Sequence, residues 1–371
     1  MPKYFPNKFI PAAEAMLIPA GAILAAMLLF AAFVYAIGQS PLDVFGLIYE
    51  GAFGSSFSWK NTLLRASPLI LTGLAVAIPA QAGMVIIGGE GALALGALVA
   101  AVAGAALGGL PPLLAQLGML VAGALIGAFW IGLSGWLRNY RGVNETISSL
   151  LLSYIGIALL NFFVEGPLKD PASLNKPSTR PISAADMFGN LPGMEVHYGL
   201  LIGALCALFT WFILRFTTIG FALKTVGGNP RASQMAGLRV NRWVVGAAAA
   251  GGAAAGLAGA IEVAAVQGAA NSSVVAGYGY AGILVAFIAR QNPLAVIPVA
   301  ILLGGINAAG GMLQRRLDMP DATVLVLQGI VFVVILTSDT LTGRFRFRKQ
   351  TAAAIVASAT TATIAKSGET T

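Results

Sequence analysis

Long apolar runs dominate this chain of 371 residues, and they constrain its fold more than any other feature. Hydrophobic residues make up 57% of the sequence and charged residues only 10%. A soluble domain carries roughly 25% charged residues, because it has to cover its surface with polar groups. The outer surface of this chain must therefore face an apolar medium, and a lipid bilayer is the medium that fits.

Apolar windows long enough to cross about 30 Å of hydrocarbon recur along the chain. They predict an all-α polytopic membrane protein with about ten transmembrane helices, at residues 16–37, 67–87, 90–109, 112–136, 145–165, 198–216, 243–267, 274–290, 293–311 and 322–338. The 46 glycines are consistent with this fold, because small residues let helices pack closely in a membrane. The segment 42–58 is too polar to span and is predicted to lie at the membrane interface.

The distribution of Lys and Arg predicts how these helices are oriented. When the N-terminus is placed inside and ten spans follow, the inner side receives about twice as many basic residues as the outer side. The pattern predicts a multi-pass membrane protein with both termini in the cytoplasm. The formal charge of +8 is explained by the same bias, so it does not indicate nucleic-acid binding.

The sequence therefore predicts one transmembrane domain at residues 1–349 and a flexible cytoplasmic tail at 350–371, which is rich in Ala and Thr. An outer loop at 165–197 and an inner loop at 215–242 are the long connections. The inner loop carries five basic residues and no acidic one. Its centre predicts a turn at Gly227–Pro230 and then a short helix at Arg231–Ala236.

Asn229 is a natural N-cap for that short helix, Pro230 suits its first position, and Gly237 ends it. A short helix with small residues on the cytoplasmic face has two interpretations. It is either a docking element that fits a groove on a partner or a solvated basic loop that satisfies the positive-inside rule. The residues alone leave both interpretations open.

Acidic side chains at membrane depth are few, namely Glu90, Glu145 and Glu262. A charge that faces lipid costs about 2.5–3.5 kcal/mol, so each should face the bundle interior, a cavity or the interface. Glu90 and Glu145 are predicted at cytoplasmic helix ends, where the helix dipole and loop arginines favour a structural role. Glu262 lies most of the way across its helix. The candidate pathway-lining residues are Gln81, Glu90, Asn144, Glu145, Glu262 and Asn307, with Asn161, Gln267 and Asn271 as further polar positions. Interhelical hydrogen bonds are the alternative role of each.

Enzymatic chemistry has no support in the sequence. The single histidine, His197, is interpreted as a solvated loop residue, and the single cysteine, Cys206, excludes an internal disulfide and a cysteine metal cluster. The turn Gly88–Gly91 lacks the Lys and Ser/Thr of a phosphate-binding loop, and no other nucleotide-binding motif occurs. No catalytic residue, cofactor or metal site is predicted, and any ATP that drives this protein must bind to another polypeptide.

Four segments carry a further pattern: Gly88–Gly91 with the small-residue helix 92–109, Arg141–Ile147 continuing to Leu152–Ile155, Gly220–Val240, and Gly256–Val263. In this order they resemble bacterial ABC importer permeases of the branched-chain amino acid, ribose and nucleoside permease family. With the outer-loop sequence GPLKD, the chain looks most like the longer permease subunit of nucleoside and simple-sugar importers.

This resemblance implies that residues 1–349 form the permease domain of an ATP-driven importer in a bacterial inner membrane, and that the importer carries a nucleoside. Its implied partners are an ABC ATPase, a second permease in a homodimer or heterodimer, an extracytoplasmic solute-binding protein and the bilayer. The inner loop would contact the ATPase through Gly220, Gly227, Gly228, Asn229, Pro230, Arg231, Ala232, Ala236 and Gly237. A ribose-type or branched-chain amino acid permease and a stand-alone secondary transporter are the alternatives.

Overall fold

The computed structural model describes residues 9–173 and 175–338, and the regular elements in these ranges are helices without any β-strand. The all-α prediction is therefore confirmed. Residues 45–324 form one compact unit, and the described residues before and after it belong to another. The predicted boundary at 349, the tail 350–371 and both termini lie outside the described residues.

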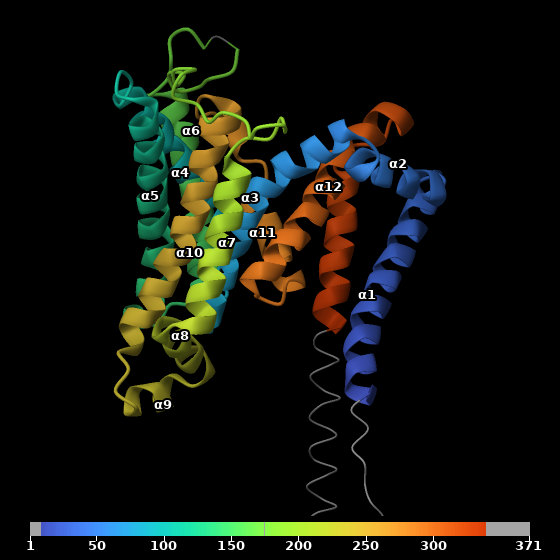
Figure 1. Cartoon of the computed structure of the whole chain (residues 1–371), viewed down its shortest axis with the longest axis horizontal. Helices are drawn as coiled ribbons and strands as arrows, with labels where there is room; N and C mark the ends of the chain where they lie inside the picture. The colour runs from blue at the N-terminus through green and yellow to red at the C-terminus, as the bar shows by residue number, and fades with distance from the viewer. Residues whose placement is uncertain (1–8, 174, 339–371) are drawn as a thin grey trace, which may run out of the picture. The chain divides into compact units, whose positions relative to one another are not determined.

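Figure 1 labels the helices in chain order. They are α1 (Phe9–Ala36), α2 (Pro41–Phe53), α3 (Ser56–Gln81), α4 (Gly89–Ala106), α5 (Pro112–Arg141), α6 (Glu145–Glu165), α7 (Gly199–Phe216), α8 (Thr218–Gly228), α9 (Pro230–Met235), α10 (Val240–Glu262), α11 (Tyr278–Ile288) and α12 (Pro293–Leu317), followed by a helix at Thr323–Ser338. Each of the ten predicted spans is thus helical over most of its length.

Seven of the described helices are long and apolar enough to cross a membrane: α3, α4, α5, α6, α7, α10 and α12. An eighth span results if Gly21–Ala36 is joined with α2. Two apolar segments, Ser272–Ile288 and Thr323–Ser338, are helical but shorter. The structure is therefore a polytopic membrane protein, in which the described parts of two predicted spans are shorter than 18 residues.

The helix α3 begins eleven residues before its predicted start, because Ser55 caps it and accepts a hydrogen bond from the Ser58 N–H at 3.1 Å. The predicted interfacial segment 42–58 therefore includes α2 and the first turn of α3. Lys60 and Arg65 lie inside α3, although the hydropathy pattern places them in an outer loop. At the other end α3 stops at Gln81, and residues 82–88 run without helix to α4.

The predicted span 274–290 is interrupted near its start, because the chain between α10 and α11 contains two glycines at positive φ. Gly268 (φ +67°) ends a π-helical turn at Val263–Gln267, and Gly277 (φ +80°) precedes α11. The 11 residues of α11 rise only about 16 Å, roughly half of the hydrocarbon thickness. We call residues 262–277 the polar break; they comprise the end of α10, the π-helical turn, and an otherwise irregular stretch that contains one 3-10 turn at Ser272–Val274.

The centre of the unit 45–324 is built on small residues of α10. A Cβ at Gly256 would lie 2.0 Å from the carbonyl oxygen of Gly123 on α5, and a Cβ at Gly259 would lie 2.0 Å from that of Leu93 on α4. The backbones of these helices are thus in direct contact, as expected for membrane helices that pack by small residues. This packing positions α10, which connects α9 to the polar break.

The unit 45–324 has two ends that differ in structure (Figure 1). The long connection between α6 and α7 lies at one end, which we call the loop end. The helices α8 and α9 lie at the other, which we call the α9 end. The 18 residues of α7 connect the two ends. The predicted outer loop 165–197 corresponds to the non-helical residues 166–198, of which residue 174 is not described.

Candidate functional site

The α9 end contains a helix that the inner-loop pattern does not predict. Residues Thr218–Gly228 form α8, which buries Ala222, Leu223 and Val226. The predicted turn at Gly227–Pro230 begins too early, because Gly227 and Gly228 belong to the last turn of α8. The spacing of the three buried residues, three and four apart, is the helical signal that could have revealed this element.

The short helix that follows confirms the prediction for this part of the loop. Asn229 caps α9 by accepting a hydrogen bond from the Ala232 N–H at 3.1 Å, and Pro230 takes the first helical position. The buried Ser233 donates its hydroxyl proton to the Asn229 carbonyl at 2.8 Å. Gly237 follows with φ +83°, which stops the helix. The outer surface of α9 is thereby fixed relative to α8.

Large apolar side chains are exposed on these two helices. Met235 is 91% exposed and Phe221 is 70% exposed, and the neighbouring Arg231, Ala232 and Ala236 are exposed as well. We call these five residues the α9 surface. Exposed apolar side chains beside a charge are typical of a surface that another protein covers.

Two glycines place α8 in backbone contact with the rest of the bundle. A Cβ at Gly220 would lie 2.4 Å from the Leu214 carbonyl oxygen of α7, and a Cβ at Gly227 would lie 2.2 Å from the Gln81 carbonyl oxygen of α3. A Cβ at the neighbouring Gly228 would meet nothing within 4 Å. A displacement of α8 must therefore push on α7 and on the end of α3.

The chain after α3 is attached to α5 and α6. Arg138 donates to the Gly83 carbonyl at 3.0 Å and forms an ion pair with Glu145 at 2.8 Å. Thr146 donates to the Val85 carbonyl at 2.9 Å. Asn144 caps α6 by accepting from the Thr146 N–H at 2.9 Å. These contacts give Asn144 and Glu145 roles at a helix end, which is the role that the sequence favours for Glu145.

The sequence predicts Glu90 at a helix end on the cytoplasmic face, but the structure places it deeper in the bundle. Its neighbour Gly91 donates its N–H to the Ser153 hydroxyl at 2.8 Å, and Ser153 lies eight residues into α6, about 12 Å along that helix. The predicted depth of Glu90 is wrong because α4 starts inside the bundle, after the non-helical residues 82–88. Glu90 is completely buried.

Both carboxylate oxygens of Glu90 accept hydrogen bonds from the first residues of α11. The Gly277 N–H donates to Oε1 at 2.8 Å and the Gly279 N–H donates to Oε2 at 2.5 Å. A Cβ at Gly279 would lie 2.2 Å from the Glu90 nitrogen, so the two helix starts touch by backbone. A carboxylate at the N-terminus of two helices is stabilised by both dipoles. Glu90 thus joins α4 to α11 in the middle of the bundle.

Polar side chains follow one another along the polar break. Glu262, which is 7% exposed, accepts a hydrogen bond from Gln267 at 3.4 Å. Ser273 donates to the Gln267 side-chain oxygen at 3.2 Å, and Lys176 from the loop end donates to the Ser273 hydroxyl at 3.0 Å. The buried Asn271 accepts from the Ser273 N–H at 2.9 Å. Of the predicted polar positions, the structure therefore brings Glu262, Gln267 and Asn271 together.

The loop end covers the polar break through backbone hydrogen bonds. The Thr179 N–H donates to the Ala270 carbonyl at 2.9 Å, and the Ile182 N–H donates to the Gly268 carbonyl at 2.8 Å. An ion pair between Lys60 and Glu195 connects the loop to the start of α3 and lowers the pKa of the exposed Glu195. Helix-breaking backbone at membrane depth is tolerated when it is packed against protein in this way.

Arg65 is a charged residue that the hydropathy pattern assigns to the wrong environment. It lies nine residues into α3, about 14 Å from the start of the helix, and its side chain is exposed. An exposed arginine inside a spanning helix is costly when it faces the lipid tails. We therefore expect the side chain of Arg65 to face water, the membrane interface or another protein.

The remaining candidate positions lie apart from the polar break. Gln81 is at the α9 end, where it donates to the Gln291 carbonyl at 3.1 Å and lines a recess of about 230 Å³ with Arg215 and Lys224. Asn307 is half-buried on α12, and Asn161 is half-buried on α6. These contacts do not show whether a solute passes Gln81, Asn307 or Asn161. A role for these residues in lining the pathway therefore stays a prediction.

His197 is buried rather than solvated. It is 3% exposed, its Nδ1 accepts a hydrogen bond from the Gly199 N–H at 3.1 Å, and burial lowers its pKa to about 4. The interpretation of this residue as a solvated loop histidine is therefore wrong. The loop end folds back onto the start of α7, and a window of hydropathy cannot show that.

Comparison with known proteins assigns this chain to a family. Residues 58–336 match the profile described as branched-chain amino acid transport system / permease component. The chain belongs to this permease family. It is 31% identical to the glucose ABC transporter permease protein TsgB13 of Haloferax volcanii over 90% of each chain. It is 29% identical to the guanosine ABC transporter permease protein NupP of Bacillus subtilis, over 87% of this chain and 93% of that one.

A third relative, the nucleoside ABC transporter permease protein NupB of Lactococcus lactis, is 27% identical over 86% of this chain and 90% of its own. The resemblance inferred from the four sequence segments is thus confirmed. This permease is a multi-pass transport component of an ABC system.

Proposed function

We propose that the chain is the transmembrane subunit of an ABC importer that carries a nucleoside across the cytoplasmic membrane. The observation that carries this proposal is the α9 surface, an exposed apolar and basic patch on a short helix whose neighbour α8 is in backbone contact with α3 and α7. A separate ATPase that moves α9 would move these helices with it. In this proposal the ATPase partner hydrolyses ATP, and the permease converts the motion of the ATPase into opening of the pathway.

The polar break is our proposal for the part of the pathway that meets the solute. Its side chains include donors and acceptors, namely Glu262, Gln267 and Ser273, in a chain that is otherwise apolar. In secondary transporters, interrupted helices near the middle of the membrane hold the solute and ion sites, and we extend this principle to the permease. Arg65 marks the face of α3 that meets water or the second permease. The two permeases, identical or different, would enclose the pathway between such faces.

The orientation proposed here places the α9 end in the cytoplasm and the loop end outside. The α9 end carries an excess of basic residues, as the positive-inside rule requires: Arg138, Arg141, Arg215, Lys224, Arg231, Arg239 and Arg242. We also propose, from the distribution of Lys and Arg along the sequence, that both termini are cytoplasmic. An extracytoplasmic binding protein would dock on residues 166–198 and deliver the solute above the polar break.

Nucleoside is the proposed solute because two of the three relatives described above carry guanosine or nucleoside in their names. A simple sugar is the second candidate, supported by the glucose permease relative. Competition separates these solutes: cells that depend on this importer should take up labelled guanosine, and unlabelled nucleosides should block the uptake while glucose and ribose should not. The reverse order of competition would assign the chain to sugars.

The role as an importer subunit is tested by isolating the tagged permease in mild detergent. An ATPase subunit should be recovered at near-equal amounts, and Met235→Asp should reduce that amount about tenfold, since a charge replaces the most exposed apolar contact. Gln234→Asp, an exposed neighbour outside the α9 surface, is the matched control. Recovery of the permease alone in several detergents, with uptake that continues without ATP, would indicate a stand-alone secondary transporter instead.

A further inference from the structure

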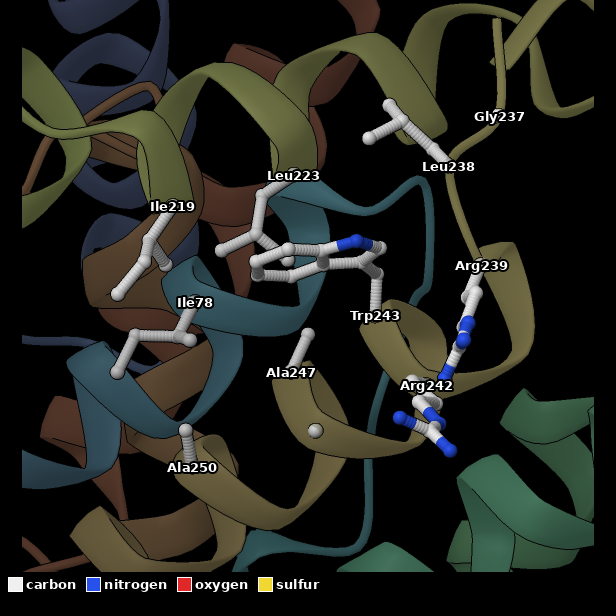
Figure 2. Close-up of a pocket in the computed structure, with 11 residues that line it drawn as sticks. Ile78, Ile219, Leu223, Gly237, Leu238, Arg239, Arg242, Trp243, Ala247 and Ala250 are labelled. Carbon is white, nitrogen blue, oxygen red and sulfur yellow. The ribbon is translucent and has the colours of Figure 1, made fainter. Parts of the chain in front are cut away.

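A groove of about 620 Å³ lies beside α10 at the α9 end. Its walls come from α3, α8, the connection after α9 and the first half of α10. Figure 2 shows Arg239 and Arg242 at one end of the groove and Ile78, Ile219 and Ala250 at the other. Trp243 lies between them, next to Leu223 and Ala247. The groove is thus basic at one end and apolar along the rest.

The groove has about the length of one membrane leaflet. The twelve residues from Arg239, the N-cap of α10, to Ala250 rise about 16 Å, and half of a 30 Å hydrocarbon core is about 15 Å. The apolar stretch from Trp243 to Ala250 makes up about 10 Å of this length. Ile219, Gly246 and Ala250 are exposed on its walls. When the arginines at the start of α10 are placed among the headgroups, as the positive-inside rule favours, these apolar walls reach the depth of the acyl chains.

The basic end of the groove lacks a counter-charge from the protein. Arg239 and Arg242 are exposed, and no carboxylate forms an ion pair with either of them within the described residues. They flank the start of α10, whose first turn has no side-chain cap and no acidic residue. A helix N-terminus attracts anions, and two guanidinium groups bind phosphate oxygens by paired hydrogen bonds.

We propose that this groove binds an anionic glycerophospholipid from the surrounding bilayer, with its phosphate at Arg239 and Arg242 and an acyl chain along Ile78, Ile219 and Ala250. The occupant must be anionic at one end and apolar for about 10 Å beyond it, a combination that does not fit a nucleoside or a sugar. Basic pockets between membrane helices are known to recognise such headgroups. The lipid would contact α8 and α10 together, and therefore stabilise the position from which α9 projects.

Trp243 provides a direct measurement, because bromine on an acyl chain quenches a nearby indole. The full-length permease is placed in nanodiscs of phosphatidylcholine that contain a small fixed fraction of brominated phosphatidylglycerol or brominated phosphatidylcholine. The chain has five tryptophans, so the difference between the wild type and Trp243→Phe isolates the Trp243 signal. The brominated anionic lipid should quench that signal much more than the brominated zwitterionic lipid does.

Arg239→Gln and Arg242→Gln should each weaken the apparent affinity for the anionic lipid about fivefold. Arg242→Lys, which keeps the charge, should retain most of it. Arg141→Gln removes an exposed arginine of the same end, outside the groove, and should leave the quenching unchanged. A thermal unfolding curve of each variant confirms that it is folded.

Three results would overturn the proposal. Equal quenching by the two lipids would show that the groove takes any acyl chain. A preference for phosphatidylglycerol that survives both Gln substitutions would place the headgroup elsewhere. Absence of quenching by either lipid would show that protein covers the groove, by a second permease or an ATPase. None of these results depends on which solute the permease carries.

Discussion

At the α9 end, Gly220 and Gly227 bring α8 into backbone contact with α7 and α3, whereas at the polar break side chains connect the segments. Glu90 binds the first N–H groups of α11 there, where Gly279 adds one backbone contact, and Gln267 and Ser273 link Glu262 of α10 to Lys176 of the loop end. Backbone contact has no free space to absorb a shift, because packed interiors resist even one added methyl group. Side-chain hydrogen bonds can break and re-form with other partners.

The two regions should therefore fail in different ways. The contacts of α8 should be sensitive mainly to added volume, whereas the contacts of the polar break should be sensitive mainly to the loss of a donor or acceptor. The same difference suits the proposed cycle, in which α8 and α9 deliver a displacement and the polar break changes its hydrogen bonds in response. Each prediction below tests one side of this comparison.

The largest effect is expected from Glu90→Ala. It removes both acceptors of the Gly277 and Gly279 N–H groups in a buried position, and hydrogen bonds to a charged group contribute about 1.5–3 kcal/mol each. The free energy of unfolding in detergent should fall by about 3–6 kcal/mol. Glu90→Gln keeps the size and one acceptor oxygen, so it should lose less. An alanine variant as stable as the wild type would show that the carboxylate is not what joins α4 to α11.

A second test compares two adjacent glycines in the last turn of α8. Gly227→Ala places a methyl group 2.2 Å from a backbone oxygen of α3, which should cost about 1–3 kcal/mol and reduce ATP-coupled uptake. Gly228→Ala meets open space, and alanine favours helix, so stability should rise by up to about 1 kcal/mol. Thermal unfolding and uptake are measured for both. Equal behaviour of the two variants would remove the basis for calling the α9 end volume-sensitive.

Gly227 and Gly228 show how much of this structure can be predicted from the sequence alone. Hydropathy windows predicted the all-α membrane fold and most helix positions, since an apolar run of twenty residues has few alternatives. The cap at Asn229 and the stop at Gly237 were predicted because their chemistry is local. The different environments of Gly227 and Gly228 were not predicted, because they depend on where α3 ends, 146 residues earlier in the chain.

The centre of the molecule was harder to predict for the same reason. A window average treats Gly268 and Gly277 as neutral, yet their positive φ values end one helix and begin another. Arg65 was assigned to a loop because the apolar window begins after it. The partners of Glu90 on α11 are 187 and 189 residues away, so no local pattern indicates them.

A third prediction concerns pH at the loop end. The pKa of His197 is about 4 in the folded protein, below its usual 6.5, so the folded state binds fewer protons than the unfolded state between these values. Stability is therefore complete above pH 6.5 and is lost as the pH falls toward 4. From pH 7 to pH 5 the loss should be about 2 kcal/mol.

The control for this effect is His197→Gln, which cannot titrate and keeps an acceptor for the Gly199 N–H. Unfolding midpoints at pH 7 and pH 5 are compared for the two proteins in the same detergent. The wild type should lose more stability on acidification than the variant does. An equal loss would mean that other groups set the pH dependence of the loop end.

The smallest effect is expected at the α9 end from Asn229→Ala, which removes the N-cap of α9. Loss of an N-cap costs about 1 kcal/mol, and the cost here is confined to a six-residue helix at the surface. Amide hydrogen exchange of peptides that contain Ala232 should accelerate about fivefold, while the unfolding midpoint of the whole permease stays the same. Asn229→Asp keeps the cap oxygen and should exchange like the wild type.

This variant sharpens the comparison because it loosens α9 without adding volume. If α9 transmits motion as a rigid extension of α8, uptake should fall in Asn229→Ala while the amount of bound ATPase changes little. Unchanged uptake in a variant with faster exchange would show that α8 alone, through Gly220 and Gly227, suffices to couple the α9 end to the bundle.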